Sequence, residues 1–255
     1  MPLSPEQEWT LTACGLVAHA DGILEVGEWD RVLWMLDDRI GDGDASAWVS
    51  LLADRERLRA HMEGLAPPMP FFNEPILEKA WRMALADGEG SEQEAAVHDA
   101  LAARLGIDAT EAARLRAHWL AQAHVRSELV AGFAAILANL DGVLDSSEIQ
   151  ALDALLDHLP TPEERRPALR AMRDDPPALP DVVGELMAMD PEERRIALLE
   201  LIPLVHACGG APRERNLLLD VARQLAVSTE EIEHRLEEHR LGRGHRQGHG
   251  HRHDG

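Results

Sequence analysis

The chain has 255 residues, of which 45% are hydrophobic, only 4% are aromatic and none is Tyr, and its formal net charge at pH 7 is −21. Ala and Leu are the commonest apolar residues, and Val, Ile and Thr never gather into the alternating runs that strands require, so we expect an all-α protein. Because so negative a chain repels phosphate backbones, a nucleic-acid partner is not expected.

No apolar stretch is long and continuous enough to span a bilayer, which needs about 20 apolar residues, although peripheral membrane association is compatible with this composition. The first residues show no basic region followed by an apolar segment, so a cytoplasmic location is expected. Cys14 and Cys208 lack metal-type spacing and are interpreted as small buried hydrophobes.

An offset of 120 residues aligns the two halves of the chain without gaps at their most distinctive points. It places HADGILEVGEWDRVLWML (19–36) on NLDGVLDSSEIQALDALL (139–156), and ALADGEGSEQEAAVHDALAARLGI (84–107) on LVHACGGAPRERNLLLDVARQLAV (204–227). A second offset of 66 relates the two motifs inside each half. The sequence therefore predicts two tandem helical bundles, each built from two pseudo-symmetric helix-loop-helix halves.

Each of these four quarters begins with a helix, which ends at Asp-Gly in the first three. Gly can take the left-handed conformation that ends helices, so a bend is expected there and a second helix after it. Ser91 and Glu94 have the spacing of a capping box, and Asp145 and Glu148 form a close variant. The second helices carry apolar residues at helical spacing, including Trp29, Val32, Leu33 and Leu36, and Ile149, Leu152, Leu155, Leu156 and Leu159.

Pro-rich connections, LAPPMPFFNEP (65–75) and RDDPPALP (173–180), separate the paired quarters and are expected to be loops or short broken helices. We expect one domain over residues 1–126 and a second over 127–241. No Gly or Pro linker stands between them, which favours a rigid tandem. Residues 242–255, rich in Gly, Arg and His, are expected to be disordered.

The motif A-x-A-D-G followed by Glu and an amphipathic helix, with ALADGEGSEQEAAVHDALAARLGI as the best match, resembles the TerB-like tellurite-resistance domain. The likeness covers two tandem domains and most of the chain apart from its tail. It implies an all-α bundle, acidic loop residues proposed to bind a metal ion, a role in stress or metal resistance alongside partner proteins, and no established enzymatic activity. The fourth quarter departs from the pattern, because Ala207 or Cys208 stands where Asp87 stands in the second, while Glu214 remains.

Hard divalent cations such as calcium, magnesium or manganese need several oxygen ligands, and one Asp with one Glu supplies too few. If the bends of paired quarters face each other, four carboxylates meet in the first half, while the second half retains a weaker set. The candidate metal ligands are therefore Asp21, Glu28, Asp87, Glu94, Asp141 and Glu148. The alternative is that Asp-Gly only makes the turn and Glu only caps the helix.

The tail histidines, His245, His249, His251 and His253, could chelate nickel, zinc or copper, or could simply belong to a low-complexity end. All six Trp lie in the first half. Most are expected in the core, whereas Trp34 lies off the buried stripe and is a candidate for a partner-binding patch.

No phosphate-cradling loop, His-Glu-x-x-His motif or nucleophile elbow is present, so a non-enzymatic protein is expected. The leading hypothesis is a metal-responsive or stress-related interaction protein that binds a divalent cation through its Asp-Gly…Glu loops and docks a protein partner. Two alternatives remain: a purely structural helical adaptor without metal, or an enzyme whose site between the halves leaves no linear signature.

Overall fold

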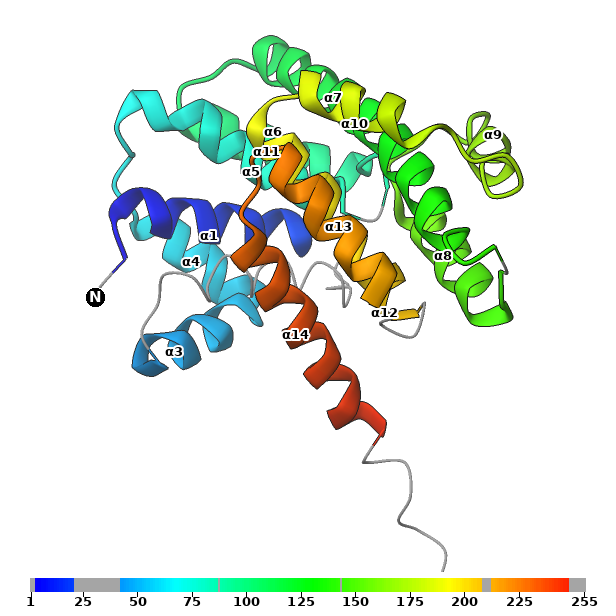
Figure 1. The fold of residues 1–255 in the computed structure, drawn as a ribbon. Coiled ribbons are helices and arrows are strands. Elements are labelled where there is room, and N and C mark those ends of the chain that lie inside the picture. The colour runs from blue at the N-terminus through cyan, green and yellow to red at the C-terminus, as the bar shows by residue number, and fades with distance from the viewer. Residues whose placement is uncertain (1–2, 21–41, 87, 143, 208–211, 248–255) are drawn as a thin grey trace, which may run out of the picture. The chain divides into compact units, whose positions relative to one another are not determined.

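The computed structural model describes residues 3–20, 42–86, 88–142, 144–207 and 212–247 (Figure 1). Every regular element in these ranges is a helix, which confirms the all-α class. None of the helices in the described ranges is long and apolar enough to cross a membrane. The chain divides into two compact units, residues 1–123 and 124–255.

The first unit contains six helices in its described part and the beginning of a seventh. They are α1 (Pro5–Ala18), α3 (Asp42–Leu52), α4 (Arg55–Gly64), the 3-10 helix η1 (Pro70–Phe72), α5 (Asn73–Ala84), α6 (Glu92–Arg104) and the first part of α7 (Ala109–Ala138). Helix α1 packs against α4, α5 and α6.

The described part of the second unit starts with the remainder of α7. It continues with α8 (Ser146–His158), α9 (Arg166–Ala171), α10 (Leu179–Ala188), α11 (Pro191–Glu200), α12 (Ile202–Ala207), α13 (Pro212–Gln224) and α14 (Thr229–Gln247). Helix α12 packs against α8, α11 and α14.

The boundary between the units lies inside helix α7, at residues 123 and 124, where the sequence predicted it at 126 and 127. This helix runs without interruption for 30 residues. The last helix expected in the first half and the first helix expected in the second are therefore one continuous helix.

Each unit has an apolar core of its own. The core of the first unit includes Trp9, Leu77 and Trp81, and that of the second includes Phe133, Leu152 and Leu198. Trp9, Trp81 and Trp119 are buried as expected, while Trp29 and Trp34 lie outside the described residues. Cys14 is also buried as expected, and burial raises the pKa of its thiol to about 12, whereas Cys208 is not among the described residues.

The 120-residue offset reappears in the bounds of the helices. Helix α6 spans residues 92–104 and α13 spans 212–224, and α7 and α14 begin at residues 109 and 229. The turns between them also match, because the residue after the last buried Leu has a positive φ in both: 78° at Gly106 and 57° at Ala226. Equivalent stretches of the two halves thus fold alike locally.

The Asp-Gly bend of the third quarter agrees with the sequence prediction, because Gly142 has the expected left-handed conformation, with φ of 82°. In the second quarter Asp87 lies outside the described residues. Gly90, two residues after the Asp-Gly pair, also has φ of 82°. A Cβ on Gly90 would lie 2.6 Å from the ring of Trp81, so this position needs a residue without a side chain.

The C-terminal segment also differs from the expectation of disorder over residues 242–255, because α14 continues as a helix to Gln247. Ile232 and Leu236 anchor the helix in the core of the second unit, and each residue added to an existing helix costs far less than starting one. The histidines at 249, 251 and 253 lie outside the described residues.

Candidate functional site

The two capping boxes predicted at the acidic bends are confirmed. Ser91 Oγ accepts a hydrogen bond from the backbone N–H of Glu94, and Glu94 Oε2 accepts one from the N–H of Ser91 at 2.6 Å. Asp145 and Glu148 repeat this arrangement, with Glu148 Oε2 2.9 Å from the N–H of Asp145. Hydrogen bonds from Ser147 and from the backbone hold the pKa of Asp145 below its ordinary value.

Both capping glutamates are buried, each with 8% of its surface exposed, and Glu214 holds the equivalent first-turn position of α13. The carboxylates of Glu94 and Glu148 therefore lie against the residues that precede their helices. One oxygen of Glu94 and one of Glu148 serve as caps, which accounts for these two residues without a metal ion.

The remaining candidate ligands are placed less completely. Asp141 is exposed at the third bend, while Asp21, Glu28 and Asp87 lie outside the described residues. Over the ranges that the structure describes, no three His, Cys, Asp or Glu side chains gather where they could hold a metal ion. The four-carboxylate cluster of the first half thus remains a prediction.

An exposed apolar knob, residues 69–71 (Met-Pro-Phe), projects from the Pro-rich connection of the first unit. Met69 is 53% exposed and Phe71 is 66% exposed, and Phe71 lies against Phe72 with ring centroids 4.0 Å apart. The connection forms the predicted short broken helix, η1. Sequence reasoning assigned no role to this knob, although three Pro between apolar residues were visible.

A buried cluster around His98 was also missed by the sequence. The imidazole lies between Trp81 and Trp119, with ring centroids 5.4 and 6.0 Å away. Arg116 Nη1 lies 3.2 Å from Nδ1, so Nδ1 accepts and Nε2 carries the proton that it donates to the carbonyl of Leu77 at 3.1 Å. Burial, aided by the Arg116 charge, lowers the pKa of His98 to about 4.

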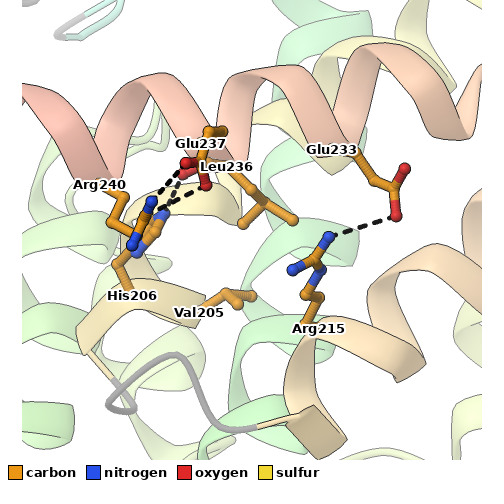
Figure 2. A pocket seen from close by; sticks show the side chains of 7 residues that line it. All are labelled: Val205, His206, Arg215, Glu233, Leu236, Glu237 and Arg240. Atoms are coloured by element: carbon orange, nitrogen blue, oxygen red, sulfur yellow. Dashed lines mark hydrogen bonds and ion pairs between the residues drawn. The ribbon is translucent and has the colours of Figure 1, made fainter.

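The second unit contains a small pocket between α12, α13 and α14, with a volume of about 280 Å³ (Figure 2). Figure 2 shows two ion pairs on its walls, Arg215 with Glu233 and Arg240 with Glu237. The other lining residues are Val205, His206 and Leu236.

The comparisons with known proteins place no constraint on these sites. No family model matches the chain, and neither a curated protein nor a solved structure is significantly similar to it.

Proposed function

We propose that this chain is a non-enzymatic helical interaction protein that docks a protein partner through the Met69–Phe71 knob. A large aromatic side chain held out into solvent is the single observation that carries the proposal, because such residues supply most of the binding energy when they enter a partner's pocket. The resemblance to TerB-like domains, with its stress or metal-resistance role, belongs to the same proposal.

The connection that carries the knob is anchored at several points. Trp9 Nε1 donates to the carbonyl of Ala66 at 2.6 Å. Arg104 Nη2 donates to the carbonyl of Leu65 at 3.4 Å, and to those of Met62 and Glu63, in the last turn of α4 just before the connection, at 2.7 and 3.1 Å. Pro68 is buried beside the knob. A loop held in this way loses little conformational entropy on binding, which favours a role in recognition.

The charge around the knob and of the whole chain indicates the chemistry of the partner's surface. Glu63 and Glu74 are exposed on either side of the knob along the chain, and the whole chain carries a net charge of −21. The complementary surface is an apolar pocket rimmed by Lys or Arg, since opposite charges at the rim speed association and reject other partners. A second copy of this chain does not fit, because its own surface is equally acidic.

The test compares proteins captured from native cells by the wild type and by Phe71→Ser. Met187→Ser is the matched control, because Met187 is equally apolar and 53% exposed in the second unit. The expected result is a protein retained by the wild type and by the control but lost with Phe71→Ser. The retained protein, once purified, should bind the wild-type chain more weakly as the salt concentration increases. Identical capture by Phe71→Ser and the wild type would refute the proposal.

A second candidate function, binding of a divalent cation, is favoured by the repeated placement of Glu94 and Glu148 against acidic bends. Glu94→Gln separates it from capping alone, because Gln also completes a capping box but carries no charge. If a cation binds, magnesium, calcium or manganese should raise the melting temperature of the wild type more than that of Glu94→Gln.

Elemental analysis of the purified protein provides an independent check of the cation site. We expect a divalent ion that is lost on chelation and is bound by the first half more tightly than by the second. Melting curves that are identical with chelator and with each cation would leave the bends as turns and caps only.

A further inference from the structure

We infer that the pocket of the second unit binds a small zwitterion of the amino-acid type, carrying an ammonium, a carboxylate and an apolar group. This inference is independent of the partner-docking function, because the knob and the pocket belong to different units. With a volume of about 280 Å³, the pocket is near the lower end of the range for small-molecule sites, which suits a ligand of this size.

The charged residues that line the pocket have uncharged counterparts in the first unit. At the 120-residue offset, Glu233, Glu237 and Arg240 of α14 correspond to Ala113, Ala117 and Leu120 of α7, and Arg215 corresponds to Ala95. Four small or apolar residues of one half are thus charged in the other. The charged pairs beside the pocket therefore belong to the second unit alone.

Two bulky residues of the first unit also have smaller counterparts in the second. Trp81 and Trp119 are buried in the first unit, where they enclose His98. Their counterparts at the offset are Leu201 and His239. Neither Leu201 nor His239 lines the pocket, but His239 stacks on His206, which does.

His206 forms the part of the wall that is fixed in orientation. Its ring stacks on that of His239, with centroids 4.9 Å apart and an angle of 27° between the planes. Its Nε2 lies 2.7 Å from the carbonyl oxygen of Leu236, so Nε2 is the protonated nitrogen. The imidazole is therefore fixed in orientation, and His206 lines the pocket together with the apolar residues Val205 and Leu236 (Figure 2).

The ion pairs provide both signs of charge for a ligand. Arg215 Nη2 and Glu233 Oε1 are 3.2 Å apart, and Arg240 Nε donates to Glu237 Oε2 at 3.1 Å. All four side chains are about half exposed or more, so these pairs are weak and can exchange partners. A ligand carboxylate can pair with a guanidinium and its ammonium with a glutamate, while an apolar side chain covers Val205 and Leu236.

The test is calorimetric and NMR titration of the full chain with L-leucine as the probe. Two analogues remove one charge each: 4-methylpentanoate lacks the ammonium, and isopentylamine lacks the carboxylate. Inorganic phosphate tests for a simple anion site. We expect leucine to bind at least about tenfold more tightly than any of the three, since each charge-assisted hydrogen bond contributes roughly this factor.

Arg215→Gln and Glu237→Gln should each weaken leucine binding by about tenfold, and Arg223→Gln should leave it unchanged. Arg223 is the matched control because it forms a similar exposed pair with Asp220 on α13 but does not line the pocket. Circular dichroism checks that the variants are folded. Absence of leucine binding, equal binding of an analogue or of phosphate, or equal effects of all three variants would overturn the inference.

Discussion

Ala226 is the described residue other than glycine with a positive φ, 57°, and it holds the position that Gly106 holds in the first unit. Both turns are closed by equivalent backbone hydrogen bonds. The N–H of Ile107 and of Val227 reach the carbonyls of Ala102 and Ala222, each at 2.9 Å. This is the Schellman arrangement, for which Gly is preferred because a Cβ is strained there.

Ala226→Gly is therefore expected to stabilise the protein by about 1 kcal/mol, because it removes the left-handed strain of an L-residue. Gly106→Ala is the reciprocal variant and should destabilise it by about the same amount. Urea unfolding of both variants measures the two changes. Two changes of the same sign would mean that the turns are not equivalent.

His98 makes stability depend on pH. Its pKa is about 4 when folded against an ordinary 6.5, so the unfolded chain binds the proton more readily. The contribution of neutral His98 is complete above pH 6.5. It is lost as the pH falls from 6.5 to 4, by about 3 kcal/mol in all.

The measurement is urea unfolding of the wild type and of His98→Gln across this range. Other groups titrate in the same window, so the difference between the two proteins isolates His98. Arg116 and Asp99, which pair with each other, are the charged groups nearest the ring and are present in both. Parallel pH profiles for the two proteins would show that His98 is not buried in neutral form.

At the scale of elements, helix α7 is held to α11 by a buried ion-pair cluster. Arg126 is paired with Glu193, and its Nε is 3.5 Å from Glu200 Oε1. Burial by itself lowers the pKa of Arg126, but the two carboxylates more than offset this and raise it. The guanidinium is therefore always charged, and α7 and α11 depend on each other.

Arg126→Met is expected to destabilise the protein by about 3–5 kcal/mol, because it leaves two buried carboxylates without this cation. Arg165→Met removes the exposed pair between Arg165 and Glu128, which lies on α7 as Arg126 does. This variant should lose less than about 1 kcal/mol of stability. Chemical denaturation compares the two. Similar losses in both variants would mean that the Arg126 cluster is solvated.

Sequence reasoning succeeded for elements whose signals are local. Ser91 with Glu94 and Asp145 with Glu148 were identified as helix starts from spacing alone, since a capping box needs only neighbouring residues. It gave no sign that residue 90 must be Gly, because that requirement comes from Trp81, nine residues earlier in the chain. Arg126 was missed for the same reason, because an Arg in a polar run gives no sign of being buried.

At the scale of the whole molecule, the net charge of −21 should oppose the compact state through self-repulsion. We expect the melting temperature to rise between about 10 mM and about 500 mM sodium chloride, as the Debye length falls from about 30 Å to a few Å. The exposed ion pairs lose little by this screening, since each contributes little. A melting temperature that falls with salt would contradict the expectation.

Melting temperatures measured in sodium chloride and in magnesium chloride at equal ionic strength distinguish charge screening from cation binding. Magnesium chloride should stabilise the protein more than sodium chloride only if a cation site exists at the acidic bends. Equal stabilisation by the two salts would leave the charge effect standing without a site.

The sequence by itself determined the all-α class, the 120-residue repeat in helix bounds and the helix caps, because helical periodicity and capping act over a few residues. Only the tertiary structure decided that α7 is continuous across the two units, that His98 is a neutral buried base, and that two ion pairs of the second half line a pocket. These features depend on which side chains far apart in the chain meet and exclude water, and no local pattern encodes that.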